Sequence, residues 1–348
     1  MASGNLLHKW FPTAERPLVI SAPMFTVANG ALAAAVTKAG GLGMVPAGMD
    51  PSATSPHLAA LDEQLAIAGR ILDESDRSSD STGGDGSLAS LPIGVGFLTL
   101  LATPEAYRAN ALPIIRRHRP AFVWLFGSEP AGYGPLIELF REAGAGWGIK
   151  VFVQVGTVEA AREVVRQGAD VVVAQGSDAG GHQFAAAASV VTLVPEIVDA
   201  LRGEGEFREG REERGRGGGG GRCGGWEGGC GGVGVGGGWG GDGDSVTGAE
   251  HIIRSSVNDA IMGYPTWSNL YAGRTILHSG LEDIANGVSI EQVHGAFKNA
   301  MSEGDEKRMI TFAGTGVGLA NKSQPAGEIV HEVRAEALAV IAKLKANF

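Results

Sequence analysis

Residues 150–182 decide the fold, with the sequence KVFVQVGTVEAAREVVRQGADVVVAQGSDAGGH. Two continuous apolar runs, 150–156 and 170–176, stand on either side of a segment with helical spacing. Thr157 occupies the position expected of an N-cap, and Gly168 follows the last helical residues. Strands that are apolar throughout are buried on both faces, which is typical of a parallel sheet. The stretch therefore predicts a strand–helix–strand unit.

The same unit recurs along residues 1–202. Four further apolar runs are expected to be strands, at 18–24, 42–46, 92–99 and 121–127. Parallel strands joined by helices need right-handed crossovers, and six of them fit either an open doubly wound sheet or a (β/α)₈ barrel. No G-x-G-x-x-G motif follows the first run, which argues against a dinucleotide-binding fold. We therefore predict an α/β protein with a (β/α)₈ TIM-type barrel.

Charge and hydropathy argue against several classes of protein. The chain has 348 residues, of which 44% are hydrophobic. It contains 28 basic and 38 acidic side chains, which gives a net charge of −10. A binder of nucleic acid or of anionic membranes would need a basic excess. No run of about 18 apolar residues could span a membrane, and the N-terminus lacks the apolar core of a secretory signal. The expectation is a cytoplasmic protein that binds neither nucleic acid nor membranes.

Residues 203–250 differ from the rest of the chain in composition. The tract holds a large share of the 56 glycines and shows no apolar periodicity, so we expect it to be disordered. Cys223 and Cys230 both lie in it, and a cysteine pair without a nearby histidine is a poor zinc signal, so no metal site is predicted. The expected organisation is six βα units at 1–202, the low-complexity segment, and a C-terminal helical part of the same domain at 251–348.

Ligands of parallel α/β barrels bind at the carboxyl ends of the strands. The loop after the strand at 170–176 is rich in glycine and ends at His182. Glycine lets the backbone approach a flat or phosphorylated ligand, and a histidine in this position can take a proton. The alternative is a tight turn beside a surface histidine. A second glycine-rich segment, 313–318, could cradle an anion but lacks the lysine spacing of a phosphate loop.

These motifs resemble those of the nitronate monooxygenases, formerly called 2-nitropropane dioxygenases. The matching stretches are Ala22-Pro23-Met24, Gln154-Val155-Gly156-Thr157 and the loop 174–182, of which the loop is the most specific. The stretches 271–274 and 313–318 are similar to the tail of the family's fungal members. The family has FMN-dependent (β/α)₈ barrels. The resemblance therefore implies FMN as the cofactor, a nitronate or nitroalkane and O₂ as substrates, and a carbonyl compound and nitrite as products.

The resemblance also implies a role for each matching residue. His182 matches the family's catalytic base, which takes the α-proton of a neutral nitroalkane, a step that an already ionised nitronate does not need. The flavin supplies the redox chemistry, and the protein supplies position and electrostatics. Flavin contacts are implied for eight residues: Ala22, Pro23, Met24, Gln154, Gln175, Gly176, Gly180 and Gly181.

The tract at 203–250 stands where the family has strands 7 and 8, whose loops hold the FMN phosphate. The sequence predicts that a disordered glycine-rich segment replaces these strands. One hypothesis is that residues 203–245 are translated non-coding or frame-shifted sequence, and the other is a lineage-specific replacement. The sequence of the mature transcript distinguishes them.

Two other functions stay open at this point. One is a related FMN-barrel enoyl reductase or dehydrogenase, which would consume NAD(P)H without O₂. The other is an inactive chain that retains no flavin because it lacks the phosphate site. Fold alone does not decide among them.

Overall fold

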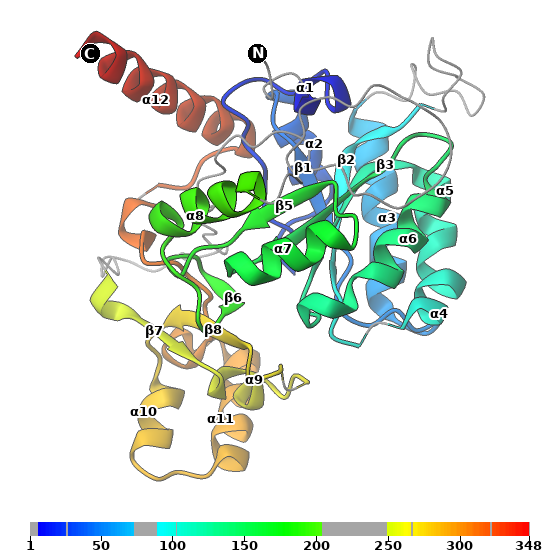
Figure 1. The fold of residues 1–348 in the computed structure, drawn as a ribbon. Helices are drawn as coiled ribbons and strands as arrows, with labels where there is room; N and C mark the ends of the chain where they lie inside the picture. The colour runs from blue at the N-terminus through cyan, green and yellow to red at the C-terminus, as the bar shows by residue number, and fades with distance from the viewer. Residues whose placement is uncertain are drawn as a thin grey trace. The chain divides into compact units, whose positions relative to one another are not determined.

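The structure is a computed structural model, and it describes residues 6–25, 27–72, 89–101, 103–203, 249–265, 267–320 and 322–347. The described residues form two compact units (Figure 1), the first made of 6–174, 194–203 and 324–347 and the second of 175–193 and 249–323. Residues 204–248, nearly all of the glycine-rich tract, lie outside the described residues, and with them both cysteines and the predicted replacement of strands 7 and 8. The division of the chain at 202 and 251 stays a prediction.

The first unit contains a sheet of five parallel strands in the order β1-β2-β3-β4-β5. The strands are β1 (Gly43–Pro46), β2 (Leu91–Leu98), β3 (Pro120–Phe126), β4 (Lys150–Val155) and β5 (Val171–Ala174). Most of their residues are buried, as their apolar runs predict. The predicted α/β fold class with parallel strands is confirmed.

The predicted strand at 18–24 is the exception. It contributes one parallel bridge, between Ile20 and Leu42, so the described sheet has five strands rather than six. Pro17 and Pro23 border this stretch, and proline has no N–H to donate to a sheet. An apolar run between two prolines is thus too short to pair along its whole length.

Helices connect the five strands of the first unit, as predicted: α3 (Pro56–Ile71), α4 (Pro104–Ala106), α5 (Leu112–His118), α6 (Gly134–Ala143) and α7 (Val158–Arg166). Two more helices, α1 (Leu6–Trp10) and α2 (Gly30–Lys38), precede β1. The predicted N-cap at Thr157 is confirmed, and Asn29 caps α2 in the same way. The Asn29 side chain accepts a hydrogen bond from the backbone N–H of Leu32 at 2.9 Å, and Thr157 accepts one from Ala160 at 3.1 Å.

The C-terminal helix α12 (Ala326–Ala346) packs on α2 and is tied to it by a buried arginine. The Arg334 guanidinium donates hydrogen bonds to the backbone carbonyls of Ala39 and Gly40, both at 2.9 Å. These carbonyls follow the end of α2, where the helix itself leaves carbonyl groups without partners. A cation there also suits the helix dipole.

The second unit contains a three-stranded antiparallel sheet in the order β6-β8-β7 (Figure 1). Its elements are β6 (Gly181–Phe184), β7 (Ile252–Ser255), α9 (Val257–Met262), β8 (Tyr271–Ile276), α10 (Ser279–Ala285) and α11 (Ile290–Glu303). The sequence predicts only helices beyond residue 250, and β7 and β8 differ from that expectation. Strands of four to six residues give little periodicity, and the pairing of His182 with Gly273 joins distant parts of the chain.

The division between the second unit and the first falls within helix α8 (Val190–Gly203), between residues 193 and 194. None of the helices in the described part of the chain has both the length and the apolar composition that a membrane crossing needs. Within the same residues, no three His, Cys, Asp or Glu side chains gather into a potential metal site.

Candidate active site

The first unit brings Pro23 and Gln154 into one row across its sheet. The Pro23 ring packs directly on Gly96 of β2. A side chain on Gly96 would not fit, since its Cβ would lie 2.2 Å from the Pro23 Cβ. Gly96 is paired with Trp124 of β3, and the Trp124 Nε1 donates a hydrogen bond to Gln154 Oε1 at 2.8 Å. Ala22 lies half-buried beside Pro23. The row therefore connects two of the predicted flavin-contacting stretches.

Gln154 lies near the carboxyl end of β4 and is 9% exposed. Because its Oε1 accepts the Trp124 hydrogen bond, its Nε2 is the group left to donate. No hydrogen bond from Nε2 to another described residue is found. Met24, the third residue of the predicted N-terminal contact, is half-buried and accepts backbone hydrogen bonds from Val27 and Ala28 through its carbonyl.

The second unit holds the glycine loop, and its glycines have different surroundings. A Cβ on Gly176 would lie 2.4 Å from the backbone N of Val190, and one on Gly180 would lie 2.7 Å from the backbone N of Gly314. Both positions need glycine because of packing inside the protein. Gly181 has φ +78°, and a Cβ added there would meet no atom within 4 Å, so its open side can admit a ligand.

The glycine-rich segment 313–318 packs against this loop. The N–H of Thr315 donates to the carbonyl of Asp178 at 3.0 Å, and the N–H of Ala313 donates to the carbonyl of Arg274 at 3.3 Å. These amides are therefore engaged within the protein. The geometry favours a supporting role for 313–318 over the anion cradle considered from its sequence.

We expect Gly180→Ala to lower the free energy of unfolding by about 1–3 kcal/mol, because the added methyl group overlaps the backbone of the 313–318 segment. Gly295→Ala is the matched control. Gly295 lies inside α11 with open space around it, and alanine there should stabilise the helix by up to about 1 kcal/mol. Urea denaturation of both variants measures the difference. Equal effects would show that the two loops do not touch.

His182 lies in β6, directly after the glycine loop. Its Nε2 lies 2.8 Å from Oδ1 of Asp259, which α9 supplies. The imidazole stacks on the Trp267 ring at 4.0 Å between centroids and 8° between planes, and Phe312 lies 5.3 Å away. The His182 side chain is 13% exposed and that of Asp259 is 6% exposed. The imidazole is thus held in one orientation by contacts from three sides.

Gln175 contacts the backbone of the same histidine. Its Nε2 donates a hydrogen bond to the His182 carbonyl at 3.0 Å. Its Oε1 is buried and has no hydrogen-bond partner in the described part of the chain. A buried acceptor without a partner is costly, which makes it a candidate ligand contact.

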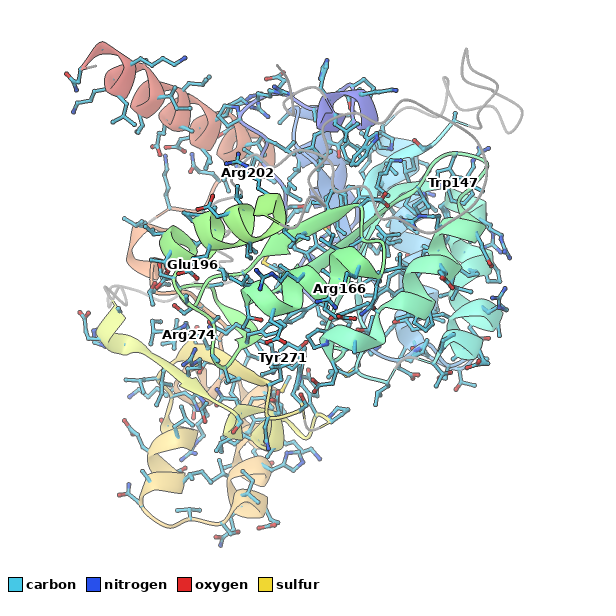
Figure 2. The ribbon with its side chains drawn as sticks, viewed as in Figure 1. Trp147, Arg166, Glu196, Arg202, Tyr271 and Arg274 are labelled. Atoms are coloured by element: carbon cyan, nitrogen blue, oxygen red, sulfur yellow. The ribbon has the colours of Figure 1, made fainter. Side chains whose placement is uncertain are left out.

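Arg274 connects β8 to the start of the loop (Figure 2 shows Arg274 and Tyr271 on this strand). Its Nη2 donates to the Ser177 carbonyl at 2.7 Å. Burial, and then the positive charge of Arg254 across the sheet, lower the pKa of Arg274. The arginine therefore helps to fix the loop that precedes His182.

A buried polar network lies next to Asp259. The Asn258 side chain donates to Thr275 Oγ1 at 3.0 Å and, through Oδ1, lies 3.0 Å from Nε2 of His278. His278 is 5% exposed, and its Nδ1 has no partner among the described residues. Burial lowers the pKa of His278. The network joins α9, and with it Asp259, to β8 and the start of α10.

This network predicts a pH dependence of stability. The unfolded chain binds a proton at His278 below a pH of about 6.5, whereas the folded protein resists protonation until lower pH. The free energy of unfolding should therefore fall as the pH falls below this value. In the His278→Gln variant, the free energy of unfolding should depend less steeply on pH, by up to about 1.4 kcal/mol per pH unit. Urea denaturation of both proteins at pH values above and below about 6.5 tests this prediction. The same pH dependence in both proteins would contradict it.

His182, Gln175 and the glycines were predicted from the sequence, whereas Asp259 and Trp267 were not. Asp259 is 77 residues from its partner in the chain and belongs to no recognisable motif. Buried and half-buried residues alternate along 271–276 in the structure, but the apolar and polar residues of this stretch do not alternate in the sequence, so no local signal indicated the pairing.

Comparison with known proteins places the chain in a family. The family model for nitronate monooxygenase matches residues 139–202. A nitronate monooxygenase of Neurospora crassa is 39% identical over 98% of this chain and 94% of its own length. The chain belongs to the nitronate monooxygenase family. Another member, nitronate monooxygenase npaC of Metarhizium robertsii, is 30% identical over 98% of this chain and 96% of its own length. As a member of this family, the chain described in this structure is an oxidoreductase.

Two solved structures share the fold of this nitronate monooxygenase family member. FabK from Thermotoga maritima matches with a TM-score of 0.61 and 17% identity over 98% of both chains. The nitroalkane oxidase of Streptomyces ansochromogenes matches with a TM-score of 0.57 and 18% identity, covering 97% of this chain and 99% of its own. Both are TIM barrels, which confirms the predicted fold class.

Proposed function

We propose that this chain catalyses the FMN-dependent oxidation of alkyl nitronates and nitroalkanes by O₂ to a carbonyl compound and nitrite, with His182 as the general base. Family membership supports the reaction. The observation that carries the assignment is the imidazole of His182, which is held by a buried carboxylate and an indole face. A surface histidine beside a tight turn would not have these contacts.

The described residues fit a flavin ring. Gln175 Oε1 is a buried acceptor that has no partner among the described residues. Gln154 accepts a hydrogen bond through Oε1, which leaves its Nε2 as a donor. Taken separately, each of these two groups could pair with the edge of a flavin ring, which carries both N–H and carbonyl groups. The open side of Gly181 gives backbone access. Ala22, Pro23 and Met24 would support the ring, while Gly176 and Gly180 would shape the loop beside it.

Bound FMN would supply the redox chemistry between the nitronate and O₂. The protein residues perform the proton chemistry. With a neutral nitroalkane, the α C–H bond breaks and its proton goes to the imidazole of His182. The electron pair of that bond forms the C=N bond of the nitronate. An ionised nitronate enters the reaction without this step, so the base is needed for one substrate form only.

Nitrite release and O₂ consumption by the purified protein, measured with a preformed alkyl nitronate, test the proposed function. We expect both, with no requirement for NAD(P)H. Consumption of NAD(P)H without O₂, or the absence of nitrite, would contradict the proposal.

A further inference from the structure

The contact between His182 and Asp259 determines which imidazole nitrogen can act as a base. An ionised carboxylate can only accept a hydrogen bond, so the proton between Asp259 Oδ1 and His182 Nε2 belongs to Nε2. A neutral imidazole with its proton on Nε2 has its lone pair on Nδ1. No hydrogen bond to Nδ1 is found from the described residues.

We propose that Asp259 is a positioning residue that holds His182 in the Nε2–H form, so that Nδ1 takes the α-proton of the substrate. The inference rests on the proposed role of His182 as the base. When the substrate C–H bond breaks, an N–H bond forms at Nδ1, and the electron pair moves into the C=N bond. The resulting imidazolium lies 2.8 Å from the Asp259 carboxylate, which stabilises its charge.

Among the described residues around His182, Asp259 is the charged group in contact with the ring. On β8 the paired residue is Gly273, which has no side chain. Trp267 and Phe312 cover the ring and carry no titratable group. Arg274 follows Gly273 on β8 and is paired with Arg254 on β7, so both arginines lie on the opposite face of the sheet.

The aromatic stacking supports a fixed ring as well. The 8° angle between the His182 and Trp267 planes leaves the imidazole little freedom to rotate. The neighbouring Asn258 helps to fix Asp259, because its buried hydrogen bonds to Thr275 and His278 anchor α9. A carboxylate, an imidazole and a stacked indole thus form a preorganised arrangement around one basic nitrogen.

The tautomer can be measured without substrate or turnover. In protein labelled with ¹⁵N-histidine, the His182 resonances are identified by their loss in His182→Gln. At a pH where the ring is neutral, we expect Nε2 to carry the proton and Nδ1 to be unprotonated. A neutral ring with its proton on Nδ1 would overturn the inference.

Kinetics of Asp259→Asn provide the second test. With a neutral nitroalkane, kcat/KM should fall roughly 10- to 100-fold, and the acid limb of its pH profile should move to lower pH because the imidazolium loses its counter-charge. The loss with a preformed nitronate should be much smaller. Asp283→Asn is the matched control, since Asp283 pairs with Arg308 in the same unit and should leave the rates and the pH profile unchanged.

The outcomes separate the two proposals. If His182→Gln retains full activity on the neutral nitroalkane, the base role and the proposed mechanism fail. If His182→Gln loses that activity while Asp259→Asn keeps the wild-type rate and pH profile, only the role of Asp259 is overturned.

Discussion

Replacing His182 by asparagine is expected to lower kcat/KM for a neutral nitroalkane by about 10²- to 10⁴-fold, the usual contribution of a positioned general base. The same variant should lose far less activity with a preformed nitronate, because that substrate has already given up its α-proton. Nitrite release from both forms of one compound, measured side by side, gives the two losses. Only the ratio between them reports on proton abstraction.

His251→Asn is the control for this experiment. His251 lies in the same unit but has a half-exposed side chain and a distant contact, 3.9 Å, to Glu250. Its replacement should change neither rate. Equal losses on the neutral and ionised substrates in His182→Asn would contradict the base role, since they would indicate damage to binding or folding instead.

The second large effect concerns stability. Arg334→Met should lower the free energy of unfolding by about 3–5 kcal/mol, because it removes two charge-assisted hydrogen bonds to buried carbonyls. The Ala39 carbonyl loses its guanidinium donor, whereas the Gly40 carbonyl keeps the hydrogen bond from the backbone N–H of Glu15. The Arg334 side chain is 6% exposed, so water cannot easily replace the lost hydrogen bonds. The α12 contact with α2 should weaken at the same time. Urea denaturation of the purified variant measures the change.

Glu15→Gln separates the carbonyl contacts from the ion pair. Glu15 lies 3.0 Å from the same guanidinium, but its side chain is 63% exposed, so its loss should cost less than about 1 kcal/mol. If this control were as destabilising as Arg334→Met, the ion pair rather than the helix carbonyls would be the main contact of Arg334.

The parallel sheet could be predicted because its signals are local. Each of β1 to β5 corresponds to one apolar run, and the N-cap at Thr157 depends on a residue only three positions later. Burial on both faces gives such strands the same pattern wherever they lie in the chain. The run at 18–24 was wrongly predicted to be a full strand, because its composition is apolar while its prolines prevent pairing.

The antiparallel sheet and the partners of His182 could not be predicted in the same way. The histidine itself was identifiable from its glycine-rich loop, a local motif. Its contacts with Asp259 and Trp267 depend on β6 pairing with a strand about ninety residues later, which local periodicity does not encode. Arg334 shows the same limit, since its role as a cap for α2 joins residues 295 positions apart.

The central claim is that this chain oxidises nitronates through bound FMN, and the visible absorbance of the purified protein tests it most directly. We predict a flavin spectrum that bleaches when a preformed nitronate is added without O₂ and returns, with release of nitrite, when O₂ is admitted. A colourless protein, or a flavin spectrum that the nitronate leaves unchanged, would contradict the account.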